Sequence, residues 1–513
     1  MSYEQRAAEM SRAEVAALLA RNDELNAQLD WFKRQLFGPK SERRFVSESG
    51  SQLWLGENDA PATATSATTV VGSHTRRRRG RRESPSVRFD ESVPIETVVI
   101  PNLEIPADEL DQYEKVSEKV TERLAQRPAA YVVLRIVRPV FKHKANETFS
   151  CPPAPITVLE KSAADVSFLA GMLIDKLAYH LPLYRQHQRL AACGVRIGRS
   201  TLTSYFHRAA ELLGPIFAAQ YESILESDVI AMDETPIKAG RKRGKPPDRG
   251  KMKTGYFWPM YGDRDEVAFL FSPTRAHAVV DRYLTEFSGT LITDGYEAYE
   301  RYAARRAGVV HAQCWAHVRR GFVAAEDAEP TLAAEALDRI AVLYREEAIA
   351  AELEPEAVLA HRREHSRPIV DAFFAKLQEA MEEQVLLPSS PYTKAARYAL
   401  DREHSLRVFL DDPAVAPDTN HLERTIRPVA VGRKNWLFCT TEVGAEALGW
   451  VQSLVVTCRL HGVDPFTYLV DVLQRVAFHP ARKVQELIPR EWKTRFADQP
   501  LQSMLNRPKG TTP

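Results

Sequence analysis

The sequence predicts a multidomain α+β protein in which a coiled-coil helix, a small β-rich module and a helix-turn-helix precede an α/β core with a helical insertion. Three observations support this prediction. The chain has 513 residues, which is too long for one hydrophobic core. Its apolar pattern changes from heptad spacing to strand-like alternation, then to helical spacing, and then to short apolar strands that end in acids. No run of about 18 apolar residues occurs, which argues against a membrane-spanning helix.

Residues 1–41 predict a coiled-coil dimerisation helix. Two seams repeat every seven residues for about three heptads, and "GPKS" at 38–41 ends the pattern. The seams consist of Val15, Asn22, Leu29 and Leu36, and of Leu18, Leu25 and Phe32. An asparagine in a seam lowers stability but fixes register and strand number. The pattern also fits an amphipathic helix that packs on its own protein, but we favour a coiled coil that forms a homodimer or higher oligomer.

Residues 42–90 predict a flexible basic linker, because they are rich in Ser, Thr, Ala, Gly and Arg and have little apolar periodicity. The block "RRRRGRR" at 76–82 is either a solvated surface or a set of phosphate contacts. From 91 to 160, "ETVVIPNLEIP" and "AYVVLRIVRPVFKHK" alternate apolar and polar residues as strands do. This range predicts a small β-rich module that binds DNA.

Residues 161–220 predict a helix-turn-helix. An apolar-periodic helix runs through Leu190, a glycine-containing turn follows at 193–198, and Ser200 is expected to cap the next helix. The exposed start of this second helix is where groove contacts are made. The residues placed there are Arg199, Thr201, Thr203 and Ser204. Because the turn is longer than in the tightest examples, an ordinary helical hairpin remains an alternative.

Residues 221–440 predict the α/β core. "SDVIAMDETPI" and "GTLITDGYEAY" are short apolar strands that end in acids, and "TGYFWPMYGD" and "VAFLFSP" are strands of a probable hairpin between them. The chain is almost wholly helical from about 325 to 410, which predicts an insertion in this core. Residues 441–513 predict a C-terminal helical region, with helices near 444–460 and 464–478 followed by a tail.

Three acids are candidate metal ligands. Asp233 and Asp294 each follow an apolar strand, and strand ends are where open sheets collect ligands. Glu423 lies among cations on a helix that we expect Asn420 to cap and Pro428 to break. Each acid alone also fits a cap or a solvated ion pair. Together, three converging carboxylates need a counter-charge, which Mg²⁺ or Mn²⁺ supplies; we expect two ions that act on a phosphoryl group.

Basic residues are unevenly distributed although the formal net charge is only +1. The segment 238–253 holds eight lysines and arginines against one acid, Asp248, and would lie beside the acids in the core. Such clusters fit either a solvated surface or the phosphate backbone of DNA. The further side chains expected to contact DNA are Arg76, Arg77, Arg78, Arg79, Arg241, Lys242, Arg243, Lys245, His317, Arg319, Arg320, Arg424, Arg427, Arg433 and Lys434.

The cysteines predict neither a disulfide framework nor a four-cysteine zinc site, because the five of them contain no C-x-x-C pair. "HAQCWAHVRR" places His311, Cys314 and His317 at three-residue steps, but zinc would need a fourth ligand. We favour an arrangement in which Cys314 packs in the core and His317 faces the site or the DNA.

The chain resembles the large TnpC-type transposases of the insertion sequence 66 family. The motifs that carry the resemblance run in order along nearly the whole chain: "LDWFKRQLFGPKSER", "HLPLYRQ", "AMDETPI", "TDGYEAY", "CWAHVRR", "NHLERTIRPVAVGRKNWLF" and "GVDPFTYLVDVL". The resemblance implies a DDE enzyme with an RNase H-like core, in which Asp233, Asp294 and Glu423 bind the metals. Glu234 adjoins Asp233, but neighbouring strand residues face opposite ways, and the family motif selects Asp233.

The resemblance further implies an enzyme that cleaves DNA at the 3′ ends of a mobile element and joins them to target DNA. Its partners would be the terminal inverted repeats, the target DNA and small accessory proteins of the element. Members of the family usually carry a cysteine-rich zinc module before the helix-turn-helix, but 95–160 keeps only Cys151, so no structural zinc is expected. The N-terminus has no apolar signal segment, which predicts a cytoplasmic, nucleoid-associated protein. The alternatives are a DNA-binding regulator that does not transpose and a nuclease-fold scaffold whose acids serve as caps.

Overall fold

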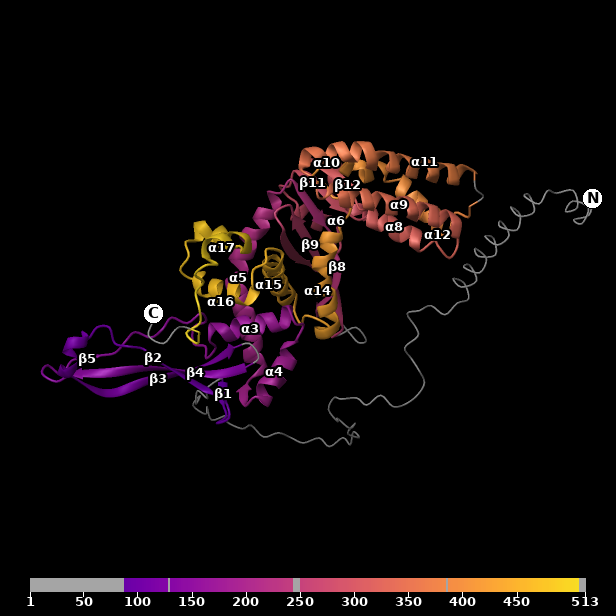
Figure 1. Cartoon of the computed structure of the whole chain (residues 1–513). Helices are drawn as coiled ribbons and strands as arrows, with labels where there is room; N and C mark the ends of the chain where they lie inside the picture. Colours follow the sequence, from indigo (N-terminus) through magenta and orange to yellow (C-terminus); the bar gives the residue numbers. More distant parts are fainter. Residues whose placement is uncertain (1–86, 128–129, 243–249, 384–385, 507–513) are drawn as a thin grey trace, which may run out of the picture.

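The computed structural model describes residues 87–127, 130–242, 250–383 and 386–506 (Figure 1). The predicted coiled coil at 1–41 and the arginines at 76–79 lie outside these residues, as do Arg243 and Lys245. In the described part, a small sheet lies at one end of the molecule, a helical bundle lies at the other end, and a larger sheet lies between them (Figure 1). The structure is therefore mixed α/β with several layers.

The small sheet is built around one long antiparallel hairpin. Its strand order is β2-β4-β3, with the short β5 also paired to β4. β2 runs parallel to β4, whereas β3 and β5 run antiparallel to it. β4 is largely buried and β3 is largely exposed along its first ten residues. The bounds are β2 Ile95–Val99, η2 Ala107–Gln112, β3 Tyr113–Arg127, β4 Ala130–His143 and β5 Phe149–Ser150.

Three helices follow in the range predicted as a helix-turn-helix, and the turn between the last two contains a strand. This strand, β6, pairs antiparallel with β1, a strand at the end of the range predicted to be a linker. The helix after β6 begins at Arg199. Gly198 is its N-cap and no side chain caps it, so the expectation that Ser200 caps it was wrong. The elements are β1 Val87–Phe89, α3 Val166–Leu177, α4 Leu183–Ala192, β6 Val195–Ile197 and α5 Arg199–Leu225.

The central sheet has the order β10-β9-β7-β11-β12, with β8 paired to β9 at the side. β7, β11 and β12 are parallel, and β9 and β10 are antiparallel to their neighbours. β7 and β10 are buried throughout, as expected of short apolar strands that are covered on both faces. The bounds are β7 Val229–Met232, β8 Thr235–Arg241, β9 Met252–Gly262, β10 Glu266–Ser272, β11 Gly289–Thr293 and β12 Val309–Gln313.

Helices cover both faces of this sheet. Alternate residues of β10 separate the two faces: Val267 and Phe269 pack with α15, whereas Ala268 and Leu270 pack with α6 and α7. α15 also reaches the edge of β10, where the hydroxyl of Ser453 accepts a hydrogen bond from the Phe269 amide at 2.8 Å. A helix from the C-terminal region thus completes the core. The bounds are α6 His277–Tyr283, α7 Glu297–Ala304 and α15 Glu442–Leu460.

The helical bundle follows β12 and includes the range predicted to be an insertion. Trp315 lies at its centre, fully buried against Phe373, Phe374 and Phe409. A π-helical turn, η3, joins two of its helices. The elements are α8 Trp315–Val323, α9 Pro330–Ala350, α10 Pro355–His361, η3 Arg362–Ser366, α11 Arg367–Glu383, α12 Pro391–Leu400, α13 Glu403–Arg407 and η4 Val408–Leu410.

The helix that carries Glu423 differs from its prediction at both ends. α14, Asn420–Trp436, has Thr419 as its N-cap, and no side chain caps it, so Asn420 is a helical residue and not a cap. Pro428 does not break the helix, which continues for two further turns because Val429 and Trp436 beyond it are buried. The tail after the predicted C-terminal helices also contains a helix. The remaining elements are α16 Pro465–Arg475, η5 Ala481–Leu487 and α17 Pro489–Phe496.

Within the described ranges, no helix combines the length and the apolar character needed to cross a membrane.

Candidate active site

Two of the predicted acids meet at one edge of the central sheet. Asp233 directly follows β7 and Asp294 directly follows β11, and these two strands are parallel neighbours. Parallel neighbours end at the same edge, so residues one step beyond each strand lie close together. The amide of Tyr296 donates to Oδ1 of Asp294 at 3.0 Å, which fixes the turn that presents this carboxylate.

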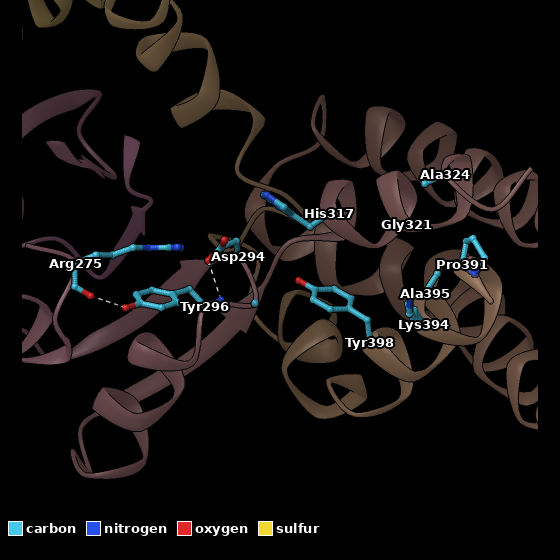
Figure 2. Close-up of a pocket in the computed structure, with 11 residues that line it drawn as sticks. Arg275, Asp294, Tyr296, His317, Gly321, Ala324, Pro391, Lys394, Ala395 and Tyr398 are labelled. Atoms are coloured by element: carbon cyan, nitrogen blue, oxygen red, sulfur yellow. Dashed lines mark hydrogen bonds between the residues drawn. The ribbon is translucent and has the colours of Figure 1, made fainter. Parts of the chain in front are cut away.

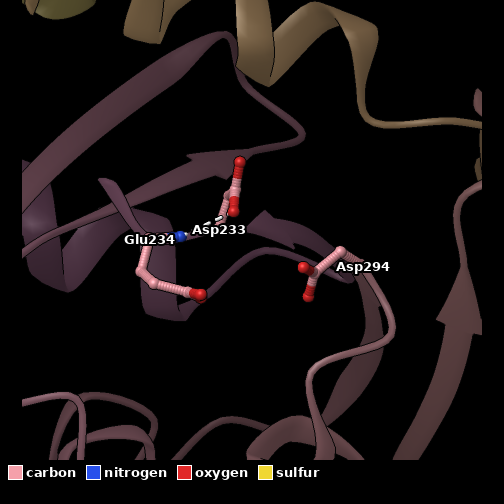
Figure 3. A group of neighbouring side chains, drawn as sticks. All are labelled: Asp233, Glu234 and Asp294. Carbon is pink, nitrogen blue, oxygen red and sulfur yellow. Dashed lines mark hydrogen bonds between the residues drawn. The ribbon is translucent and has the colours of Figure 1, made fainter. Parts of the chain in front are cut away.

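Glu234 joins the two aspartates. One carboxylate oxygen from each of Asp233, Glu234 and Asp294 lies within 4.8 Å of the other two (Figure 3). The expectation that Glu234 faces away rested on strand alternation, but Asp233 and Glu234 lie in the connection between β7 and β8, where that alternation does not hold. The amide of Glu234 even donates to Oδ1 of Asp233 at 2.7 Å.

Burial and mutual repulsion perturb these carboxylates. Burial, followed by the charge of Glu234, raises the pKa of Asp233 to about 7, and Asp294 and Glu423 act in the same direction. Burial also raises the pKa of Glu234, and the charge of Asp294 adds to this. Arg275 forms an ion pair with Glu234, and the Tyr299 hydroxyl donates to it at 2.9 Å, which opposes the rise. The group therefore carries more negative charge than its surroundings neutralise.

These residues fit a hard divalent cation. Carboxylate oxygens are the ligands that Mg²⁺ and Mn²⁺ prefer, and three of them converge here with a shortage of positive charge. A bound cation would stabilise the charged form of Asp233 and oppose the rise of its pKa. Asp233, Glu234 and Asp294 thus converge closely enough to hold a metal, but Arg275 and Tyr299 already bind the two carboxylate oxygens of Glu234.

Glu423, the third acid predicted from the sequence, lies at the side of this group. Both oxygens of its carboxylate accept hydrogen bonds from Nη2 of Arg320, and the two side chains form an ion pair. His317 Nε2 lies 4.0 Å from the same carboxylate. Glu423 is close enough for its charge to raise the pKa of Asp233, yet it is not one of the three acids whose oxygens lie within 4.8 Å. Sequence reasoning did not foresee the pairing of Glu423 with Arg320.

The raised pKa of Asp233 predicts a pH-dependent stability. The folded chain binds this proton more tightly than the unfolded chain, where the ordinary pKa is 3.8, so the contribution of Asp233 to the free energy of unfolding falls as pH rises from 3.8 to about 7. We expect Asp233→Asn to raise the free energy of unfolding of the metal-free protein at pH 8 by about 1–3 kcal/mol and to change it little near pH 4. Thermal unfolding with a chelator at the two pH values measures this. An equal gain at both would contradict the assignment.

The motif around His317 supplies packing as well as polar groups. Cys314 is buried, and its sulfur accepts from the amide and the hydroxyl of Thr419, each at 3.3 Å. His311 contacts the Thr293 hydroxyl at 2.9 Å. His317 Nε2 lies 3.1 Å from Nη1 of Arg320, and burial together with the charge of Arg320 lowers the pKa of His317. Nδ1 of His317 is buried and has no partner among the described residues.

A cavity of about 720 Å³ opens beside Asp294, between the central sheet and the helical bundle (Figure 2). The side chains of His317 and Tyr398 extend from the bundle toward Asp294 (Figure 2). The guanidinium of Arg275 lies 4.0 Å from the ring centre of Tyr296. Sequence reasoning missed Arg275, Tyr296, Tyr398 and Lys394, which line this cavity, because no local motif marks them.

The polar residues predicted for groove contacts lie at the start of α5. Arg199, Thr203 and Ser204 are exposed, and Thr201 is half-buried. The Thr203 hydroxyl donates back to the Arg199 carbonyl at 3.0 Å, so only part of its capacity is free. Together they form a polar, exposed helix start, as a recognition helix requires.

The predicted phosphate contacts divide into free and engaged side chains. Arg241 and Lys242 at the end of β8 are exposed, as are Arg319, Arg424, Arg427 and Lys434. Arg433 is engaged within the protein, because its guanidinium donates to the Thr235 hydroxyl at 2.9 Å and to the Pro236 carbonyl at 2.7 Å. Arg433 therefore joins α14 to β8. Arg320 is likewise engaged, with Glu423.

Comparison with known proteins gives consistent matches along the chain. Residues 161–447 match the profile described as "Transposase IS66 family", residues 453–490 match "IS66 C-terminal element", and residues 24–98 match "Transposase C of IS166 homeodomain". The uncharacterized protein y4hP of Sinorhizobium fredii is 30% identical over 91% of this chain and 88% of its own length. The uncharacterized protein y4jD of the same organism is 28% identical over 92% and 94%.

One solved structure, the Drosophila P element transposase strand transfer complex, aligns over 67% of this chain and 90% of that chain. Its sequence identity is 10% and its TM-score is 0.23, which is too low for an argument about this fold.

Proposed function

Because the chain belongs to the IS66 family of transposases, we propose that it is a DDE transposase that cleaves the 3′ ends of its mobile element and transfers them to target DNA. The observation that carries this proposal is the convergence of Asp233, Glu234 and Asp294 at one edge of the central sheet. The mixed sheet, with its three parallel strands, its antiparallel pair and helices on both faces, supports an RNase H-like core.

Asp233 and Asp294 are the residues that would hold Mg²⁺ or Mn²⁺, with Glu423 as the third ligand of the active form. A pair of such ions activates an attacking oxygen and stabilises the leaving oxygen of a phosphodiester. Glu234 has a different role in this proposal, because Arg275 and Tyr299 each bind one of its two carboxylate oxygens. It adds negative charge to the site and holds Arg275 against the cavity wall. His317, with its free buried Nδ1–H, would donate to a phosphate oxygen in the cavity.

DNA would be held by the exposed cations around the site. Arg424, Arg427 and Lys434 on α14 and Arg241 and Lys242 on β8 are exposed and belong to two elements that Arg433 joins. Contacts of this kind fix the duplex without reading its sequence. Base reading of the terminal inverted repeats would fall to the start of α5, at Arg199, Thr201, Thr203 and Ser204. Oligomerisation through residues 1–41 and accessory proteins of the element belong to the same proposal.

The experiment is metal-dependent cleavage of duplex DNA that carries the element's inverted repeats. We expect the wild-type protein to nick this DNA with Mg²⁺ or Mn²⁺ and not with a chelator. Glu423→Ala should lower the rate by about 100-fold or more, and Glu234→Gln should lower it by less, because ligands that act on the reacting phosphate contribute most to the rate. Equal rates for Glu423→Ala and wild type would remove Glu423 from the ligand set. Binding of the repeats without any nicking would instead support the second candidate, a regulator that does not transpose.

A further inference from the structure

Arg320 binds the carboxylate of Glu423, which is the third ligand of the proposed metal site. Arg320 lies on α8 and Glu423 lies in the first turn of α14, so the pair joins the helical bundle to the helix of the third acid. Both carboxylate oxygens of Glu423 accept from the same Nη2 of Arg320. In this arrangement Glu423 is not among the acids whose oxygens converge within 4.8 Å, although its charge still reaches Asp233.

The ion pair between Arg320 and Glu423 is weak enough for another ion to replace either partner. The side chain of Arg320 is 53% exposed and that of Glu423 is 28% exposed, so water weakens their attraction. Ion pairs of this kind contribute little to stability, and a divalent cation or a phosphate can replace one member without a large penalty. A fully buried pair, by contrast, would resist such an exchange.

A DNA phosphate is the natural replacement partner for Arg320. A guanidinium binds a phosphate through charge-assisted hydrogen bonds of the same kind as those it donates to a carboxylate. Arg320 lies beside the exposed Arg319 on α8, and the exposed Arg424 and Arg427 lie on the helix that carries Glu423. DNA that follows these cations would therefore bring phosphates to Arg320.

We propose that Arg320 is a positioning residue that couples DNA binding to assembly of the metal site. Without DNA, Arg320 holds Glu423 away from Asp233 and Asp294. When a phosphate of the DNA binds the Arg320 guanidinium, Glu423 is released and completes the set of metal ligands with Asp233 and Asp294. The inference rests on the proposed function, in which Glu423 is a metal ligand. It requires that DNA and metal each tighten the binding of the other by the same factor, because coupling between two binding sites is reciprocal.

The test measures Mn²⁺ affinity of the full chain, with and without a duplex taken from the element's inverted repeat, by counting free Mn²⁺ in electron paramagnetic resonance spectra. Wild type should bind Mn²⁺ more tightly with the duplex than without it. Arg320→Gln should tighten Mn²⁺ binding without DNA by about 2- to 5-fold, which is the effect expected from loss of an exposed ion pair. It should also remove most of the gain caused by the duplex.

Two further variants separate this mechanism from simpler ones. Removing a positive charge near acids attracts cations by itself, so Arg320→Gln is also made in the Glu423→Gln background, where it should no longer change Mn²⁺ affinity. Arg301→Gln removes an exposed cation that pairs with Glu297 on α7 and is not among the predicted DNA contacts, so it should leave the gain caused by the duplex intact. An unchanged Arg320→Gln effect in the Glu423→Gln background, or an unchanged duplex gain in Arg320→Gln, would overturn the proposal. Absence of Mn²⁺ binding that depends on Asp233 and Asp294 would instead overturn the proposed function.

Discussion

Replacing Asp294 with Asn is expected to lower the rate of DNA cleavage by about 1000-fold or more, which corresponds to roughly 4 kcal/mol of transition-state stabilisation. The substitution removes one negative charge and one strong ligand oxygen from the group that Asp233 and Glu234 share. It should not disturb the local fold, because an asparagine oxygen can still accept the 3.0 Å hydrogen bond from the Tyr296 amide. Single-turnover cleavage of end-containing duplex with Mg²⁺ measures the effect.

Asp263 provides a matched control for this substitution. Its Oδ2 accepts from the Asp228 amide at 2.8 Å, so its carboxylate accepts a backbone hydrogen bond as that of Asp294 does, but it lies in the β9–β10 connection, outside the acidic group. Asp263→Asn should therefore leave the cleavage rate within about twofold of wild type, as for surface changes that keep a hydrogen bond. Similar losses for both variants would show that Asp294 acts through the fold and not through the chemistry.

Replacing Arg362 with Met is expected to destabilise the helical bundle by about 3–5 kcal/mol. Arg362 and Glu347 form an ion pair at 2.8 Å in which each side chain is only 5% exposed. The same guanidinium donates to the carbonyls of Phe409 at 2.5 Å, Asp412 at 2.8 Å and Val415 at 3.2 Å. The substitution leaves the buried carboxylate of Glu347 without its counter-charge and the carbonyls without this donor. Unsatisfied buried polar groups lower the free energy of unfolding more than the loss of an exposed pair does. The midpoint of thermal or urea unfolding measures the loss.

Arg367→Met, at the start of the adjoining helix, is the control for this substitution. Arg367 pairs with Asp411 at 2.5 Å, but the side chains are 35% and 73% exposed, so its loss should cost less than about 1 kcal/mol. A second substitution, Glu347→Gln, should recover part of the stability of Arg362→Met, because it removes the buried charge left behind. If the two arginine variants were equally unstable, burial would not explain the role of Arg362.

The sequence predicts the two aspartates of the site because their signal is local. A four- or five-residue apolar strand followed at once by an acid marks Asp233 and Asp294, and both strands are found where expected. Whether Glu234 joins the two aspartates depends on where β7 ends. A strand that continued past Met232 would turn Glu234 to the opposite face from Asp233. Arg275 and Tyr299 reach Glu234 from residues 41 and 65 positions away, so no local pattern could place them.

The errors in the helices have the same physical origin. Pro428 suggests the end of a helix by local rules, yet the burial of Val429 and Trp436 keeps α14 continuous. The strand β6 needs β1, more than 100 residues earlier, and a three-residue strand has no pattern of its own. The ion pair between Glu423 and Arg320 likewise depends on how the helical bundle packs on the core, because the two residues lie 103 positions apart in the sequence.

The contact between α15 and β10 closes one side of the central sheet to other chains. β10 is an outermost strand of the five-strand path, and its outward amides would otherwise be free to pair with a foreign strand. Ser453 takes the amide of Phe269, Thr457 takes the amide of Val267 at 3.1 Å, and Gln220 donates to the carbonyl of Val267 at 2.7 Å. These contacts thus protect β10 from edge-to-edge pairing with a strand of another chain.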